Sequence, residues 1–127
     1  MRADNQPQSP VKIDVVQAGA APAKERADHA PIRLERTRDT GLRHVDGAIS
    51  MARAEPDSAT SDFFVCVGAQ PELDFGGRRN PDGQGFAAFG KVVKGMDVIR
   101  RIHRAPAQGQ ALEPPIRILE ARVLEGR

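Results

Sequence analysis

The chain has 127 residues, which fits one domain and leaves no room for two ordinary ones. Nineteen basic and 17 acidic residues give a net charge of +2, and this mild, mixed charge is not that of a nucleic-acid binder. Twelve glycines and ten prolines favour a turn-rich β or α+β fold over a helical bundle.

The N-terminal third carries one clear structural signal. Residues 1–10 are polar with two prolines and are expected to form a loop. Apolar residues then alternate over residues 11–17, the period-2 pattern of a β-strand. Residues 18–46 lack a period and are expected to form a long irregular loop. Loops of this length in a compact domain are usually functional or disordered.

The signals become stronger after Gly47. Residues 48–53 alternate as a strand, and residues 63–67 (FFVCV) are apolar on both faces, which predicts a buried strand. A turn through Pro56 and Asp57 separates the two. The segment NPDG at 80–83 predicts a second turn, because proline presets φ and glycine closes the turn.

The last third predicts two more strands and one helix. Residues 86–93 read as a strand, and apolar residues at helical spacing over 95–103 predict a short amphipathic helix. A proline-rich loop is expected over 104–115, and a closing strand over 116–124, where a slip in the apolar phase indicates a β-bulge. The sum is five strands, mostly antiparallel, and one helix.

Metal, nucleophilic and phosphate-binding chemistry find no support in the motifs. The soft metal ligands show no pair at ligand spacing, so hydrogen-bonding or surface histidines are the expectation, with no metal and no cofactor. No G-x-S-x-G or G-x-x-x-x-G-K-[ST] motif is present. The candidates considered and set aside are His29, His44, His103, Cys66, Ser50, Ser58 and Ser61.

Membrane insertion and secretion find no signal in the chain as given. Its longest apolar stretch, residues 63–67, is too short to span a bilayer, and no apolar segment follows Met1 as in a signal peptide. Because Cys66 is the single cysteine, an internal disulfide is excluded, and the cysteine content does not indicate a cellular compartment.

Several blocks resemble the cyclophilins, the peptidyl-prolyl cis–trans isomerases. The stretch GAISMARAEPDSATSDFFVCV at 47–67 resembles the family's central signature, and PELDFGGRRNPDGQGFAAFGKVVKGMDVI resembles the block that follows it. VVQAG at 15–19 is similar to the strand that carries the family's active-site Gln, and residues 116–124 resemble its last strand. The resemblance is strongest over 11–124, within a single domain at 1–127.

The resemblance implies a site for a proline-containing peptide. It places Gln17 on the family's substrate-binding Gln, which with Phe64 would form the catalytic pair. Phe64 would form the floor of the proline pocket, with Leu73 and Phe86 as its walls. The strand segment that hydrogen-bonds the substrate backbone in the family falls on Ala52, Arg53 and Ala54.

The chain departs from the family pattern at four places. Glu72 stands where many members have Trp, which puts high affinity for cyclosporin-type inhibitors in doubt, and Phe86 stands where His is frequent. Ala18 precedes Gly19 where the family usually has two glycines. No residue matches the family's catalytic Arg, whose strand would lie upstream of Met1 together with the family's first strands and first helix.

The resemblance thus implies an N-terminally incomplete, cyclophilin-like antiparallel β-barrel with a short helix. The implied activity is isomerisation of Xaa-Pro bonds in peptides and unfolded proteins, to assist folding, without nucleic acid or membrane. The alternative is a proline-peptide binding module impaired in catalysis. Gln17 and Phe64 are expected to line one groove, and the chain is expected to isomerise poorly and fold marginally. It would be cytoplasmic as it stands, or periplasmic or secreted if a signal peptide precedes Met1; its oligomeric state is open.

Overall fold

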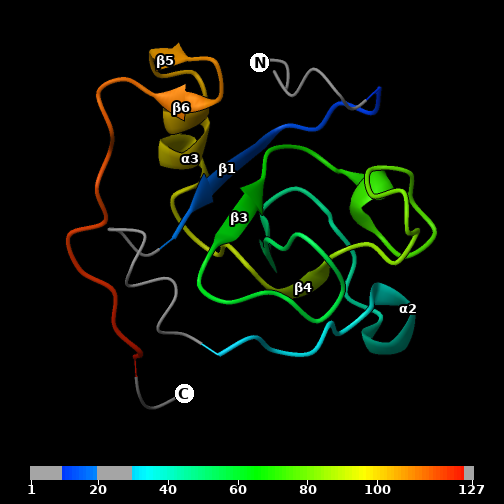
Figure 1. The fold of residues 1–127 in the computed structure, drawn as a ribbon. Helices are drawn as coiled ribbons and strands as arrows, with labels where there is room; N and C mark the ends of the chain where they lie inside the picture. The colour runs from blue at the N-terminus through cyan, green and yellow to red at the C-terminus, as the bar shows by residue number, and fades with distance from the viewer. Residues whose placement is uncertain (1–9, 20–29, 125–127) are drawn as a thin grey trace.

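The computed structural model describes residues 10–19 and 30–124 of the chain. Its helices and strands are short. The expectations for residues 1–9 and 20–29, including His29, lie outside the described residues. In chain order the elements are β1 (Val15–Ala18), α2 (Thr37–Thr40), β2 (Ala48–Met51), β3 (Phe63–Cys66), the 3₁₀ turn η1 (Pro71–Leu73), β4 (Ala87–Lys91), α3 (Met96–His103), β5 (Ala107–Gln108) and β6 (Ala111–Leu112) (Figure 1).

A four-stranded antiparallel sheet organises the described residues. Its strand order is β1-β3-β2-β4, so β3 lies inside the sheet with a partner on each side. The apolar run FFVCV suits this place, because a strand with neighbours on both edges and a core beneath it must be apolar. The mainly-β, antiparallel organisation expected from the sequence is confirmed.

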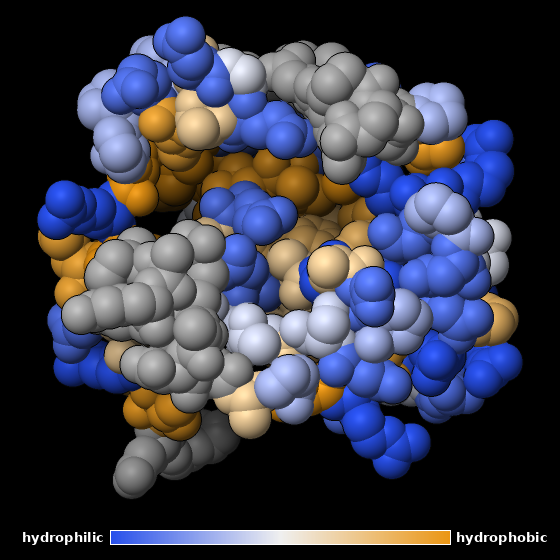
Figure 2. Space-filling view, in the orientation of Figure 1, coloured by the Kyte–Doolittle hydropathy of each residue, from blue (hydrophilic) through white to orange (hydrophobic). Residues whose placement is uncertain are grey.

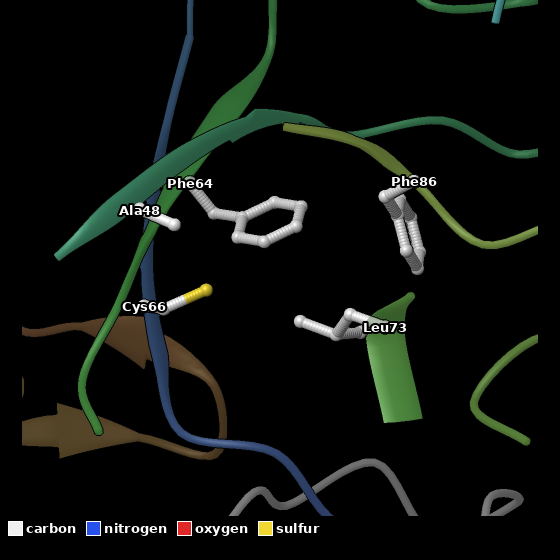
Figure 3. Packing of buried hydrophobic residues seen from close by; sticks show 5 residues of the cluster. All are labelled: Ala48, Phe64, Cys66, Leu73 and Phe86. Atoms are coloured by element: carbon white, nitrogen blue, oxygen red, sulfur yellow. The ribbon is translucent and has the colours of Figure 1, made fainter. Parts of the chain in front are cut away.

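The core lies against one face of this sheet. Its central cluster joins two strands to the segment around η1 and to the start of β4 (Figure 3). The members of the cluster are Ala48, Phe64, Cys66, Leu73 and Phe86, with Ile13, Val15 and Ala52 packed at its margin.

The helix expected over 95–103 is confirmed as α3, which contacts β1. It begins after Gly95, whose φ of 98° is a conformation that side chains disfavour. The turn expected at 80–83 is also confirmed, because the Gly83 N–H donates to the Asn80 carbonyl over 3.0 Å.

Two expected loops contain more structure than the sequence indicated. The loop expected over 18–46 contains α2, and Ile32 forms an isolated antiparallel bridge with Ala59. The loop expected over 104–115 contains a hairpin of β5 and β6, which turns at Gly109 with a φ of 63°. Both elements are too short to leave a periodic pattern in the sequence.

The closing strand expected over 116–124 was wrong. These residues form no strand, and their side chains are exposed, up to 94% for Leu119. In Figure 1 this orange-to-red segment runs along the outside of the molecule, away from the sheet. The reason is physical: a strand exists only by pairing, and among the described residues no strand lies beside this segment to satisfy its backbone.

Candidate functional site

Gln17 and Phe64 face each other across two paired strands. The register of β1 and β3 sets Gln17 directly opposite Phe64. Directly opposed residues of an antiparallel pair point to the same face of a sheet, so both side chains lie on the face that carries the core cluster. Gln17 is exposed at the rim of that face, whereas Phe64 is 3% exposed beneath it.

The structure brings together Phe64, Leu73 and Phe86, the three residues predicted to form the proline pocket. The ring of Phe64 extends from β3 toward Phe86, and the two rings meet edge to face with centroids 5.4 Å apart (Figure 3). Leu73, at the end of η1, is fully buried, and its carbonyl accepts a hydrogen bond from the Phe86 N–H over 2.9 Å. The three side chains form a closely packed apolar cluster that is almost entirely buried.

Val15 is a further member of this site that sequence reasoning did not single out. It lies two residues before Gln17 on β1, hence on the same face, and packs against the cluster. The alternating pattern of residues 11–17 already carries this signal, because it groups Val15 with Gln17.

The segment expected to bind a peptide backbone follows β2 directly. Ala52 packs beside the core cluster, and its N–H donates to the Asp62 carbonyl over 2.9 Å. Ala54 is exposed, and its N–H donates to the Ser58 hydroxyl over 3.2 Å. Both N–H groups are therefore engaged within the chain, and Ala52 places the start of the segment beside the cluster.

Arg53, between these two alanines, is turned inward. Its side chain is only 1% exposed, and its guanidinium pairs with the Asp82 carboxylate and the Gly85 carbonyl. The guanidinium carbon also lies 5.1 Å from the centre of the Phe86 ring. This charge is committed to its neighbours and is not poised toward a ligand.

A buried Asp–His–Ser network lies under Phe64. The two ring nitrogens of His44 are 2.8 Å from Asp74 Oδ1 and 2.8 Å from Ser50 Oγ, and the ring stacks on Phe64 with centroids 5.9 Å apart. His44 and Ser50 are 2% and 0% exposed, so the Ser50 hydroxyl is not placed to meet a substrate. Sequence spacing gave no sign of this network.

The electrostatics of His44 favour its neutral form. Burial lowers the pKa of His44, while the hydrogen bond and charge of Asp74 oppose that shift. A neutral imidazole matches the geometry, since it donates to Asp74 through Nδ1 and accepts from the Ser50 hydroxyl through Nε2. The network therefore serves as a support for the Phe64 ring.

The other metal-ligand candidates are also engaged or inert. The Nε2 atom of His103 lies 3.3 Å from Asp14 Oδ1, which ties α3 to the residue preceding β1. Burial raises the pKa of the Cys66 thiol to about 12, so it is not a nucleophile at neutral pH. Within residues 10–19 and 30–124, no group of three His, Cys, Asp or Glu residues is placed to hold a metal ion.

A cavity of about 650 Å³ runs beside β1. Figure 2 shows hydrophobic surface within a hollow on this face of the molecule. Gln17 lines this cavity, but Phe64, Leu73 and Phe86 do not. Gln17 thus belongs to the cavity lining, whereas Phe64, its partner across the strand pair, does not. The cavity's apolar lining includes Ile13, Val16, Ile102, Leu112 and Ile116.

Comparisons with known proteins show which family the chain is similar to. The family model "Cyclophilin type peptidyl-prolyl cis-trans isomerase/CLD" matches residues 7–123. Peptidyl-prolyl cis-trans isomerase A of Dickeya dadantii is 39% identical over 87% of this chain and 60% of its own length. Peptidyl-prolyl cis-trans isomerase of Acinetobacter baylyi is 37% identical over 79% of this chain and 53% of its own length.

The match covers most of this chain but only part of each relative. The chain spans 60% and 53% of the length of these two relatives, so part of each has no counterpart in it. Peptidyl-prolyl cis-trans isomerase B of Escherichia coli is 39% identical over 62% of the chain and 47% of its own length.

In the part of the chain that the structure describes, no helix is long and apolar enough to cross a membrane.

Proposed function

The chain belongs to the cyclophilin-type peptidyl-prolyl cis–trans isomerase family, and from that premise we propose that it binds proline-containing peptides and unfolded proteins and acts on their Xaa-Pro bonds. The observation that carries the proposal is the register of β1 and β3. It sets the polar Gln17 opposite the apolar Phe64 on one face of the sheet. A peptide with a proline ring needs both an apolar contact and a nearby polar group.

Isomerisation of an Xaa-Pro bond requires no acid, base or nucleophile among the side chains. Rotation about an Xaa-Pro bond breaks no covalent bond, and its barrier of about 18–20 kcal/mol arises because amide resonance is lost. The uncatalysed event takes tens to hundreds of seconds. A site that binds the twisted amide better than either planar isomer therefore accelerates the reaction without acid, base or metal.

Each proposed residue has a part in that preference. The proline ring packs against the apolar cluster of Phe64, Leu73 and Phe86 at the rim beside Gln17, and an apolar setting suits the twisted amide, which is less charge-separated than the planar one. The amide of Gln17 holds a peptide carbonyl or N–H at the rim. The backbone of Ala52, Arg53 and Ala54 lines the other side of the peptide.

A second function is favoured by the state of Arg53. Stabilising the localised lone pair of the twisted prolyl nitrogen calls for a hydrogen-bond donor, and the guanidinium of Arg53 is already paired with Asp82 and Gly85. The alternative is therefore a module that binds proline peptides and catalyses weakly. Removal of one preorganised donor costs about 10²–10³ in rate at comparable polar sites.

Two measurements on the purified 127-residue chain test the proposal. We expect an Ala-Pro peptide to shift the amide NMR signals of residues around Gln17 and Phe64. We expect isomerisation about 10²–10³ slower than that of a full-length relative if no group other than Arg53 supplies the donor. Gln17→Ala should weaken peptide binding, whereas Gln108→Ala, at an exposed position in β5, should not.

The outcomes separate the two functions. Binding together with isomerisation, even slow, supports the isomerase. Binding with no acceleration above the uncatalysed rate supports the binding module. Absence of peptide binding by a folded chain would overturn both, and a rate equal to that of the relative would show that another group supplies the donor.

A further inference from the structure

Arg53 is a charged side chain buried where the proposed site meets the loop at 80–85. Its Nη1 donates to Asp82 Oδ2 over 2.9 Å and its Nη2 to Asp82 Oδ1 over 3.2 Å, a two-pronged pair. Its Nε and Nη2 also donate to the Gly85 carbonyl, over 3.1 and 2.5 Å. A planar guanidinium with several matched acceptors is held in one orientation, which a lysine would not reproduce.

The carbonyl that Arg53 holds belongs to the residue before Phe86. Gly85 has a φ of 74°, and a Cβ there would lie 2.8 Å from the Leu73 carbonyl oxygen, so only glycine fits. The next N–H, of Phe86, donates to that same Leu73 carbonyl. The backbone leading into Phe86 is thus fixed by Leu73 on one side and by Arg53 on the other.

Arg53 also touches the Phe86 ring directly. The guanidinium carbon lies 5.1 Å from the ring centre, within the range of a cation–π contact. Phe86 in turn meets Phe64 edge to face. A continuous set of contacts therefore runs from Asp82 through Arg53 and Phe86 to Phe64.

Asp82 completes this arrangement from the loop. Its Oδ1 also accepts the Gln84 N–H over 2.9 Å, which closes the turn around the carboxylate. The Arg53 guanidinium beside Asp82 holds the pKa of that carboxyl below its usual value, so the pair stays ionised at neutral pH. Asp82 is one-third exposed, and it can be changed with less disturbance than Arg53 itself.

We propose that the Arg53–Asp82 pair is a positioning device for Phe86, which fixes the wall of the proline-binding surface and thereby sets the affinity for the peptide. The proposal rests on the proposed function. Arg53 acts through Phe86 and touches no reacting atom, so it is a positioning residue. A wall that is already ordered before the peptide arrives loses less conformational entropy on binding.

The test compares two single-charge changes in the full chain. Asp82→Asn removes the partner of Arg53, and Asp39→Asn removes the exposed partner of Arg38, 3.3 Å away, as a matched control. The chain is labelled with ¹³C at its five phenylalanine rings, and the Phe86 signals are assigned from a Phe86→Leu sample. An Ala-Pro peptide is titrated into each variant.

We expect Asp82→Asn to shift and broaden the Phe86 ring signals and to raise the Kd for the peptide about tenfold, in line with the cost of ordering a side chain on binding. Asp39→Asn should leave both as in the unchanged chain. Asp82→Glu, which keeps the charge on a longer arm, should restore the ionised pair and fall between the two. It also serves if Asp82→Asn does not fold.

The failures of the inference and of the proposed function are distinguishable. If the unchanged chain binds the peptide and Asp82→Asn binds it within twofold, with unaltered Phe86 signals, the inference is overturned. If Asp82→Glu disturbs Phe86 as much as Asp82→Asn, the ion pair is not what positions the ring. If the folded, unchanged chain binds no peptide, the proposed function fails, and the Phe86 signals alone decide whether the pair orders the ring.

Discussion

The strand β3 and the segment 116–124 were both predicted to form strands from their apolar residues, but they end in different structures. β3 pairs with β1 on one side and β2 on the other, and Phe64 and Cys66 are 3% and 0% exposed. The segment 116–124 pairs with nothing among the described residues, and its Leu119 and Val123 are 94% and 92% exposed. Hydrophobic content therefore does not decide which of the two becomes a strand.

What separates them is the availability of neighbours. A β-strand satisfies its backbone only through adjacent strands, and its side chains gain from burial only if another layer covers them. β3 has both, because β1 and β2 flank it and η1 and β4 place Leu73 and Phe86 on its face. The proposed peptide site depends on the same property, since it is built on the face that β3 shares with β1.

The largest effect is expected from removing the Phe64 ring at the centre of β3. We expect Phe64→Ala to lower the free energy of unfolding by about 3–5 kcal/mol, the usual cost of deleting a buried phenylalanine ring. A domain has only about 5–15 kcal/mol in total. Urea unfolding followed by circular dichroism measures the change, because the chain has no Trp or Tyr for fluorescence.

A matched substitution on the same sheet controls this result. Phe89 in β4 is 52% exposed, so Phe89→Ala removes the same ring from a place where much less surface is buried. We expect it to cost far less than Phe64→Ala. Equal losses for the two variants would mean that the β3 face is not packed as the structure has it.

Local patterns predicted the parts of the fold that depend on nearby residues. The apolar run of β3, the helical spacing of α3 and the NPDG turn all carry their signal within a few residues, and all three form. The apolar pattern at 116–124 predicted a strand that does not form, because whether a strand has a partner is a property of the whole sheet. The short helix α2 was missed because four residues leave no period.

The candidate site was predictable to the same extent. The family resemblance named Gln17 and Phe64, and whether these bind a peptide stays a prediction. The contacts that hold the site lie far apart in the sequence: Arg53 and Asp82 are separated by 29 residues, and His44 and Asp74 by 30. No spacing rule relates such residues, so only the structure brings them together.

A change of pH sharpens the comparison at the support beneath Phe64. Burial lowers the pKa of His44 in the folded chain below the ordinary value of 6.5. As the pH falls through 6.5, the unfolded chain therefore binds a proton at His44 more readily than the folded chain does. Stability from this group is complete above that value and declines as the pH falls below it, by at most about 1.4 kcal/mol per pH unit. We therefore expect the Tm to fall between pH 7.5 and pH 5.

The variant His44→Gln isolates this effect from the titration of the other histidines. Glutamine can still donate to Asp74 or accept from Ser50 but takes up no proton, so the Tm of the variant should depend less on pH than that of the unchanged chain. Its Tm at pH 7.5 should be lower, because the stacking on Phe64 is lost. An identical slope in both proteins would show that His44 does not set the pH dependence.

The smallest expected effect lies in the segment 116–124 and can break the comparison outright. Leu119 is 94% exposed, so Leu119→Ser should change the free energy of unfolding by no more than about 0.5 kcal/mol, as surface substitutions usually do. The same urea unfolding experiment measures it, with the buried Leu73→Ala as the contrasting leucine, for which about 2–5 kcal/mol is the ordinary cost. A loss above 1 kcal/mol for Leu119→Ser would mean that the segment buries this side chain in solution. The contrast in burial between this segment and β3 would then disappear.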